Sequence, residues 1–373
     1  MTGRRMGVEE ELLLVDPDSG EPRGVAGRVV DAARWGAPPD LGADAVDQEL
    51  QNEQIETATA PCTSGRELDA DLRRRRSVAA DLARRSGVAT APMALSPLGT
   101  ETTVSRSDRY ERMREQYGLL AADQLSCGCH VHVEVDTLDE GVGVLDRIGP
   151  WLPVLRAVSA NSPFWQGADT GYASYRTTVW NRWPSAGPTG PFESVAGYDD
   201  AVAAMLDTGA LLDTGMIYFD ARLAHELGTV ELRAADVCLD VDDAVLLAAL
   251  SRALVETAAR QWRDGGPPSS ARHEVLKLAH WRASRSGLGG QLVNPWTGRP
   301  GPAHAVLDAL CAFVRDAVHD AGDDDVVRRG VARLRERGTG ADVQRAIRDR
   351  TGSLRGLVRD VVGREDHAAA GGG

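Results

Sequence analysis

The stretch Gly7-Val8-Glu9-Glu10-Glu11-Leu12-Leu13-Leu14-Val15 places three consecutive carboxylates in front of four apolar residues. Its Leu and Val content indicates a buried β-strand. Because side chains alternate along a strand, Glu9 and Glu11 share one face and Glu10 takes the other. Two carboxylates side by side at the end of an apolar strand repel each other unless a cation lies between them. The stretch therefore predicts either a metal-binding strand or a strand end whose acids reach water.

Three later segments supply polar side chains that can share a site with this strand. They are a Glu-rich segment at 49–59, an alternating Cys/Val and His strand at 125–135, and a short strand at 228–233. Pooled, the polar faces comprise Glu9, Glu11, Glu49, Glu56, His130, His132, Glu231 and Arg233. Several carboxylates with one or two imidazoles suit Mg²⁺ or Mn²⁺. A cluster this acidic indicates more than one divalent ion, which would clamp a triphosphate and neutralise charge on a transferring phosphoryl group.

The spacing of the second segment leaves its ligand open. Glu49 and Glu56 are seven residues apart, which puts them on opposite faces of a regular strand. Both can be ligands only if the chain turns or bulges between them. Glu53 shares the face of Glu49 and could take its place.

Composition limits the class of protein. The chain has 373 residues and a formal net charge of −13, which argues against nucleic acid as a partner. It has no apolar run approaching the roughly 20 residues that cross a bilayer. The few residues before the first strand leave no room for a signal peptide. We therefore expect a cytoplasmic protein that acts on small molecules.

Several other kinds of site are excluded by their motifs. Lys277 is the only lysine, and no Gly-rich phosphate loop precedes it. Cys127-Gly128-Cys129 lacks the spacing of a redox or zinc motif, so we expect the five cysteines to be small buried residues. His225-Glu226 lacks the second His of a zinc-protease helix and is interpreted as structural.

The order of elements predicts an α+β fold. Strands and helices are mixed without regular βαβ alternation, which indicates a curved, mainly antiparallel sheet with metal ligands on one face and helices packed on the other. We expect a single domain over 1–363 and a disordered tail over 364–373. Elements expected elsewhere are a strand at 216–220, a long irregular segment at 161–191, and helices at 67–85, 108–117, 198–206, 241–262, 271–285, 303–319 and 325–337.

Six motifs, in order along nearly the whole chain, resemble one family. They are Gly7-Val8-Glu9-Glu10-Glu11, Gln54-Ile55-Glu56-Thr57, His130-Val131-His132, the segment from Tyr175 to Pro184, Thr229-Val230-Glu231-Leu232-Arg233, and Trp281-Arg282-Ala283-Ser284-Arg285. Together they resemble the glutamate–cysteine ligase type 2 family of carboxylate–amine ligases, in the glutamine synthetase-like superfamily.

The resemblance implies a function and assigns roles. It implies an ATP- and Mg²⁺-dependent ligase, with Mn²⁺ as an alternative ion, that converts the carboxylate of glutamate to an acyl phosphate and then to an amide with an amine such as cysteine. Arg233 and His132 would contact ATP, and Arg176 or Arg182 a substrate carboxylate or phosphate. The implied metal ligands are Glu9, Glu11, Glu49, Glu56, His130 and Glu231.

Structural and functional alternatives stay open at this point. Singly, Glu231 with Arg233 could be a surface ion pair, the two histidines could be hydrogen-bonded core residues, and Arg176 or Arg182 could pack on tryptophan rings. Glu10 is expected to pair with an arginine. Two rival functions are a metal-dependent hydrolase with a metal-bound water and a non-catalytic nucleotide sensor. The C-terminal helices could also support a homodimer.

Overall fold

The computed structural model describes the backbone of residues 3–38 and 40–370. Among these residues, seven strands form one open sheet in the order β2-β3-β1-β5-β9-β8, and β4 pairs with the end of β1. Every pairing in the sheet is antiparallel. The strands are β1 (Met6–Val15), β2 (Asp47–Gln48), β3 (Gln54–Ala58), β4 (Ala89–Ala91), β5 (Gly128–Glu134), β8 (Ala221–Ala224) and β9 (Thr229–Asp236). The α+β class with an antiparallel sheet is therefore confirmed.

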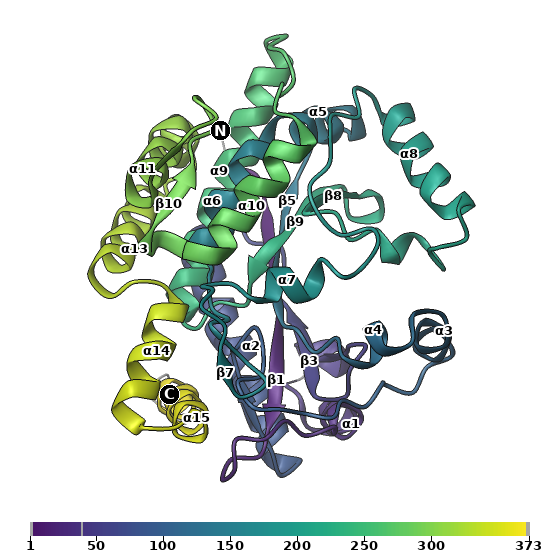
Figure 1. Cartoon of the computed structure of the whole chain (residues 1–373), viewed down its shortest axis with the longest axis vertical. Helices are drawn as coiled ribbons and strands as arrows, with labels where there is room; N and C mark the ends of the chain where they lie inside the picture. Colours follow the sequence, from purple (N-terminus) through teal and green to yellow (C-terminus); the bar gives the residue numbers. More distant parts are fainter. Residues whose placement is uncertain (1–2, 39, 371–373) are drawn as a thin grey trace.

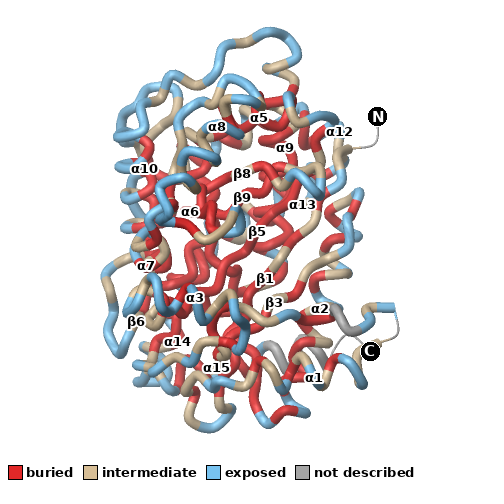
Figure 2. The backbone as a smooth tube through the Cα atoms, turned by 90° about the vertical axis from the view of Figure 1, so that its right-hand side faces the viewer, coloured by how far each residue is buried: buried red, intermediate tan, exposed pale blue. Residues whose placement is uncertain are grey.

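Helices gather against one face of the sheet and leave the other to polar side chains. Cys129, Val131 and Val133 of β5 belong to the same buried core as α5, α6 and α9, and Figure 2 shows this buried layer running through β5, β9 and α9. The helices are α1 (Ala26–Gly36), α2 (Gly65–Arg85), α3 (Asp108–Tyr117), α4 (Leu119–Ala122), α5 (Leu138–Ile148), α6 (Leu152–Val158), α7 (Arg176–Trp180), α8 (Val195–Asp207), α9 (Val241–Arg263), α10 (His273–Ser286), α11 (Ala303–Phe313), α12 (Arg315–Asp320), α13 (Asp324–Arg337), α14 (Gly340–Thr351) and α15 (Leu354–Ala370). No helix among the described residues is long and apolar enough to cross a membrane.

Two further pairs of short strands lie outside the main sheet. They are β6 (Phe164–Trp165) with β7 (Ala168–Asp169), and β10 (Gln291–Val293) with β11 (Pro300–Pro302). The first pair and α7 lie within the segment 161–191, which we expected to be irregular.

The expected strand at 216–220 is wrong. Its apolar residues are buried, but Tyr218 packs its ring against Trp180 and Trp183 instead of joining the ladder. The strand β8 begins only at Ala221, after Asp220 has accepted a backbone hydrogen bond from Arg233. Packing between rings therefore outweighs the strand tendency of this run.

The C-terminal region is helical up to Ala370, and the expectation of a disordered tail over 364–373 stays a prediction. α15 runs from Leu354 to Ala370 and so extends into the stretch 364–373, where Arg364, Glu365 and three alanines at 368–370 favour helix. Residues 371–373 lie outside the described part of the chain.

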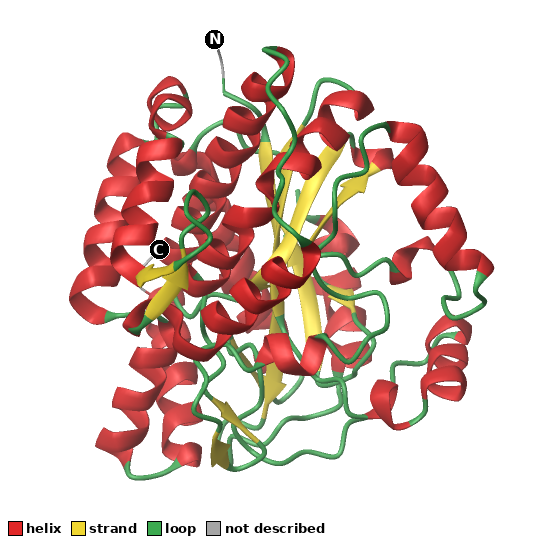
Figure 3. Ribbon diagram, turned by 45° about the horizontal axis from the view of Figure 1, so that its top comes forward, coloured by secondary structure: helices red, strands yellow, loops and turns green. Residues whose placement is uncertain are grey.

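Two helical arms stand on the side of the sheet away from α11, α13 and α14 (Figures 1 and 3). One carries α8 and the loop that follows it, and the other carries α3 and α4. Arg109 of α3 binds both carboxylate oxygens of Asp213, at 2.7 and 2.9 Å, and Gln116 donates to the carbonyl oxygens of Gly209 and Ala210. These contacts join the two arms.

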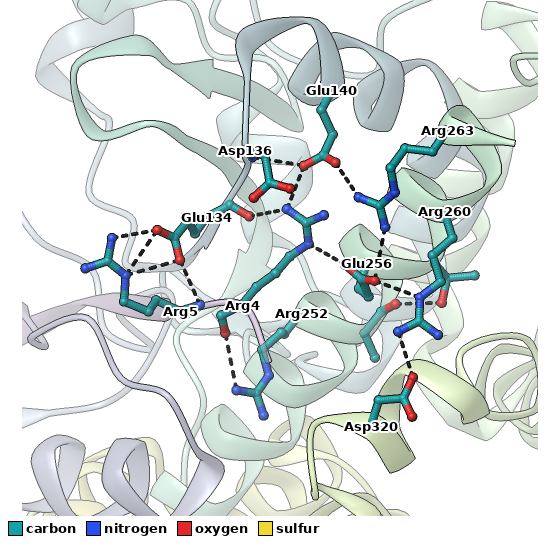
Figure 4. A network of polar contacts seen from close by, with 12 residues as sticks. Arg4, Arg5, Glu134, Asp136, Glu140, Arg252, Glu256, Arg260, Arg263 and Asp320 are labelled. Carbon is teal, nitrogen blue, oxygen red and sulfur yellow. Dashed lines mark hydrogen bonds and ion pairs between the residues drawn. The ribbon is translucent and has the colours of Figure 1, made fainter. Parts of the chain in front are cut away.

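A network of ion pairs holds the start of β1 (Figure 4). The Arg4 guanidinium donates to Glu140 of α5 at 2.7 Å and to Glu256 of α9 at 2.6 Å. It also donates to the carbonyl oxygen of Glu134 at the end of β5. Because β1 carries the central carboxylates, this network fixes the strand that the site is built on.

Replacing Arg4 by methionine is expected to lower the free energy of unfolding by about 2–3 kcal/mol, because it leaves buried carboxylates short of a partner. The side chains of Arg4 and Glu140 are 9% and 2% exposed. Arg5→Met is the matched control, since Arg5 and Glu134 are 57% and 35% exposed and form a pair that water screens. Urea unfolding followed by circular dichroism measures both. Equal losses would contradict an anchoring role for Arg4.

Candidate functional site

The register of the sheet brings distant acids and histidines together on its polar face. The directly paired positions are Glu11 with Glu56, Glu9 with His130, and His132 with Glu231. Alternation along each strand then points these side chains to one side. The groups whose ligand atoms lie within 4.8 Å of one another are Glu9–His132–Glu231, Glu9–Glu56–His130 and Glu11–Glu49–Glu56. All six expected metal ligands thus fall in one continuous cluster, joined there by His132.

Glu49 reaches the cluster because the chain turns between β2 and β3. Glu49 follows β2 directly, whereas Glu56 lies in β3. The two residues are therefore not in one regular strand, and their spacing of seven does not place them on opposite faces. Glu53, the alternative ligand, points elsewhere: its carboxylate accepts hydrogen bonds from the backbone N–H and the hydroxyl of Thr103. The structure therefore favours Glu49 over Glu53.

On the opposite face of β1, which packs against the helices, Glu10 pairs with an arginine as expected. The carboxylate of Glu10 is fully buried and accepts two hydrogen bonds from Arg76 of α2, at 2.6 and 2.8 Å. It is a structural ion pair that ties β1 to the helix layer.

His130 is oriented to offer a lone pair. Its Nδ1 lies 3.1 Å from Glu9 Oε2, and its Nε2 has no hydrogen-bond partner among the described residues. Burial, helped by the charge of Arg233, lowers the pKa of His130 to about 4. At neutral pH the ring is therefore neutral, with Nδ1–H donating to Glu9 and Nε2 unprotonated, which is the form that binds metal.

The acids of the cluster are destabilised by one another. Burial and the charge of Glu11 raise the pKa of Glu49 to about 7. Burial and the charges of Glu49, Glu9 and Glu11 raise the pKa of Glu56 well above its usual value. Carboxylates crowded in this way are stabilised by divalent cations. A set of carboxylate oxygens with one neutral imidazole is a suitable ligand set for such ions. The donor set therefore fits Mg²⁺ or Mn²⁺.

Glu231 sits between two arginines. Arg233 from the same strand and Arg222 from β8, 2.5 Å away, each contact one of its carboxylate oxygens. Although burial raises the pKa of Glu231, these two arginines outweigh it and lower the pKa to about 2. Arg222 was missed by the sequence analysis, because its strand was placed a few residues too early. Its alternating Ala-Arg-Leu-Ala pattern was the available signal.

Arg176 is buried beside the acid cluster. Its Nη1 donates to the carbonyl oxygen of Ala235 at 3.1 Å. Burial lowers the pKa of Arg176, and the negative charges of Glu11 and Asp236 oppose this effect. A Cβ added at Gly128 would come within 2.4 Å of Arg176 Nη2 and 3.0 Å of His130 Nε2. Glycine at 128 therefore lets the guanidinium approach the cluster.

Arg182 is not brought into the cluster. It forms an ion pair with Asp123 at 2.7 Å and lies over the ring of Trp165. Of the two arginines proposed for substrate, only Arg176 lies near the acids.

Two cavities meet at Glu9. One, of about 300 Å³, is lined by the acids and by a wall of aromatic and apolar side chains, and we call it the acid cavity. The other, also about 300 Å³, is mainly apolar, with Met6, Val8 and Pro61 among its lining residues, and we call it the apolar cavity. Glu9 lines both, and His132 lines the second. The cluster thus has room for a ligand on each side.

The sequence matches one protein family along most of its length. The model of glutamate–cysteine ligase family 2 matches residues 5–364. A protein of Streptomyces avermitilis provisionally named glutamate–cysteine ligase 2-1 is 51% identical over 359 residues, covering 96% of this chain and 98% of that protein. A Streptomyces coelicolor protein provisionally named glutamate–cysteine ligase 2 is 50% identical over 365 residues, covering 98% and 100%.

Two solved structures share the fold. The glutamate–cysteine ligase of Francisella tularensis, in complex with AMP, superposes with a TM-score of 0.71 at 13% identity, covering 99% of this chain and 89% of that one. A bifunctional glutathione synthetase from Pasteurella multocida gives a TM-score of 0.70 at 15% identity, covering 98% and 53%.

Proposed function

The chain belongs to glutamate–cysteine ligase family 2, and from that membership we propose that it joins glutamate, or another carboxylate, to an amine such as cysteine through an acyl phosphate. Membership makes it an ATP-dependent ligase that forms a carbon–nitrogen bond.

The observation that carries the proposal is the cluster of three groups that could hold metal ions, bordered by two cavities that share Glu9. The apolar cavity suits the flat, apolar body of a nucleobase. Glu9 and His132 stand where that cavity meets the cluster, so the triphosphate would lie across the acids. The γ-phosphate would then face the acid cavity, which holds the carboxylate and the amine.

The residues present fit the metal ions that this chemistry needs. The ligands would be Glu9, Glu11, Glu49, Glu56, His130 and Glu231, whose oxygen-rich set and like-charge crowding call for divalent cations. When bound, Mg²⁺ or Mn²⁺ neutralises phosphate oxygens during transfer.

The side chains then have distinct tasks in a two-step reaction. A carboxylate oxygen of the substrate attacks the γ-phosphorus of ATP, and the bond to the ADP oxygen breaks. Arg233, which lines the acid cavity, stabilises the charge on the transferring group. Arg176, buried beside Glu11, would orient the substrate carboxylate. The amine nitrogen next attacks the acyl carbon, the bond from that carbon to the phosphate oxygen breaks, and the proton lost by the nitrogen leaves with the phosphate. Holding both substrates in one cavity supplies proximity.

The experiment that tests the function is an ADP-release assay with Mg²⁺-ATP and a panel of carboxylate–amine pairs. Release that requires both substrates supports the ligase. A hydrolase would turn over without ATP and depend on zinc, and a sensor would bind ATP without releasing ADP under any pair.

Binding of ATP is expected to require a divalent cation, because no phosphate-loop lysine exists in the sequence and the acids would otherwise repel the triphosphate. Calorimetric titration should show little binding in EDTA and recovery with Mg²⁺. Equal affinity in both conditions would contradict the metal-mediated site.

The contribution of Glu49 to the stability of the metal-free protein is expected to fall as pH rises from about 4.5 to about 7. The pKa of Glu49 is raised from 4.5 to about 7 in the folded protein. The folded state therefore holds a proton that the unfolded state has already lost, and ionisation adds repulsion. Between pH 6 and pH 8 in EDTA, the melting temperature of the wild type should fall relative to that of Glu49→Gln, and saturating Mg²⁺ should narrow this difference. If added Mg²⁺ left this difference in melting temperature unchanged, Glu49 would not be a metal ligand.

A further inference from the structure

Arg176 is a buried arginine that has two unpaired nitrogens. Its side-chain Nε and Nη2 have no hydrogen-bond partner among the described residues. A Cβ on Gly128 would contact both this Nη2 and Nε2 of His130, so the unpaired nitrogen faces the metal-binding side of the sheet. A planar guanidinium binds a carboxylate through two donors only when its plane is held in one orientation. The position of Arg176 must therefore be set by contacts that leave Nε and Nη2 free.

Asp236, the last residue of β9, is connected to the start of α7, which lies at the end of this strand (Figure 1). Its Oδ2 accepts hydrogen bonds from the backbone N–H of Asn161 at 2.9 Å and from the hydroxyl of Ser162 at 2.7 Å. Its Oδ1 accepts a hydrogen bond from the hydroxyl of Ser174 at 2.9 Å. The hydroxyl oxygen of Ser162 in turn accepts a hydrogen bond from the backbone N–H of Arg176 at 3.0 Å. Two serine hydroxyls therefore join the carboxylate of Asp236 to the backbone at and just before Arg176.

The same end of β9 also holds the guanidinium of Arg176. Its Nη1 donates to the carbonyl oxygen of Ala235 at 3.1 Å. Burial raises the pKa of Asp236, and the charge of Arg176 opposes this effect, so the carboxylate and the guanidinium stabilise each other. Glu11 also favours the charged form of Arg176, but the proposed function assigns Glu11 to divalent ions. Asp236 belongs to none of the groups of described residues that could hold a metal ion, so it can balance Arg176 while the metal ligands are occupied.

The C-terminal end of α10 holds the backbone that leads into α7. The carbonyl oxygen of Ser284 accepts hydrogen bonds from the backbone N–H groups of Ala173 and Ser174, each at 2.9 Å. Ser284 belongs to the motif at 281–285, to which the proposed function gives no role. This part of the motif therefore serves to fix the chain just before Arg176.

We propose that Asp236 is a positioning residue for Arg176, which it holds through two serine hydroxyls so that Nε and Nη2 stay free for the substrate carboxylate. This inference rests on the proposed function, in which Arg176 orients that carboxylate. Asp236 itself is fully buried and is not among the residues that line the acid cavity or the apolar cavity. It acts through Arg176, because a small displacement of the guanidinium is enough to lose a bidentate contact.

Removal of one serine hydroxyl tests this role. In Ser162→Ala, the backbone N–H of Arg176 and one oxygen of Asp236 each lose a partner, so the guanidinium is free to shift. ADP release is measured with Mg²⁺-ATP and a carboxylate–amine pair that the wild type uses. We expect the KM for the carboxylate substrate to rise by ~10-fold, the scale of losing one hydrogen bond to a charged group. The Kd for Mg²⁺-ATP should stay within about 2-fold, since Arg176 is not assigned to the nucleotide.

Ser284→Ala is the matched control. It removes a buried hydroxyl that donates to the carbonyl oxygen of His280 within α10, and it keeps the Ser284 carbonyl oxygen that holds the backbone before α7. Melting temperatures should fall by similar amounts in Ser162→Ala and Ser284→Ala, but only Ser162→Ala should raise the KM for the carboxylate. A merely structural role would lower both melting temperatures and leave both KM values unchanged.

Ser174→Ala provides a second variant that breaks the other link to Asp236, and it takes the place of Ser162→Ala if that variant does not fold. Circular dichroism checks the folding of each variant. An active wild type whose KM for the carboxylate is unchanged in the serine variants, or rises equally in Ser284→Ala, would overturn the inference and leave the ligase function intact. A wild type that releases no ADP with any carboxylate–amine pair would instead overturn the proposed function, and this inference with it.

Discussion

Replacing Glu56 by glutamine is expected to reduce ADP release by roughly 10³-fold or more, since a phosphoryl-transfer site loses several orders of magnitude when its charge stabilisation is broken. Glu56 takes part in two of the three metal-binding groups, Glu9–Glu56–His130 and Glu11–Glu49–Glu56. A neutral amide at this position weakens both at once. Because the substitution preserves side-chain volume, the loss of ADP release measures the effect of removing the charge.

The same substitution is expected to stabilise the metal-free protein. Burial and three neighbouring carboxylates raise the pKa of Glu56 well above its usual value. A group with this shift destabilises the fold as pH rises above the unfolded pKa, because ionisation then occurs against like charges. At pH 8 in EDTA the melting temperature of Glu56→Gln should therefore exceed that of the wild type, and added Mg²⁺ should raise it less than it raises the wild type.

Glu53→Gln is the control for both measurements. Glu53 lies three residues away but bonds Thr103 outside the cluster, so its variant should keep turnover near the wild-type rate and respond normally to Mg²⁺. If Glu56→Gln turned over within a few-fold of the wild type, the assignment of Glu56 as a ligand would be wrong.

The faces of the strands could be predicted from the sequence because alternation is a local property. Glu9 and Glu11 on one side of β1, with Glu10 on the other, follow from period two alone. The same rule separated the histidines of β5 from its core valines. The structure confirms both divisions, with Glu10 bonded to Arg76 under the sheet and His130 beside Glu9 on top.

The register between strands could not be predicted in this way. That Glu11 pairs with Glu56, and His132 with Glu231, depends on how distant segments align, which hydrophobic burial and turn geometry decide together. The choice between Glu49 and Glu53 was open for the same reason, because it depends on the turn between β2 and β3. The resemblance to a family indicated which residues belong together, and the structure supplies their register.

Residues held by tertiary contacts were the ones missed or misplaced. Arg222 joins the site only because β8 pairs with β9 opposite Glu231. Arg182 looked equivalent to Arg176 in the sequence, yet Asp123 holds it outside the cluster. Ion pairs of this kind join residues far apart in the chain, and composition or spacing carries no sign of them.

Substitution of Arg233 distinguishes a catalytic role from a structural one. It shares the carboxylate of Glu231 with Arg222, so one role open to it is to balance that buried charge. The other is to stabilise the phosphoryl group in the transition state. Both arginines line the acid cavity. Arg233 is the better placed for this second role, since its side chain is the more buried of the two and its Nε has no partner among the described residues, whereas Nε of Arg222 donates to Glu231.

Lysine substitutions at the two arginines separate these roles, because lysine keeps the positive charge and loses the planar fork that binds phosphate oxygens in pairs. Charge balance around Glu231 should survive in both variants, so melting temperatures should change little and similarly. A transition-state role predicts that kcat falls by roughly 10²-fold in Arg233→Lys alone, the scale of removing one preorganised donor, while the Kd for Mg²⁺-ATP changes much less. Arg222→Lys should retain kcat within a few-fold. Equal rates in the two variants would show that Arg233 serves only as a second counter-charge to Glu231, and the stabilisation of the transferring phosphate would then have to come from another group in the acid cavity.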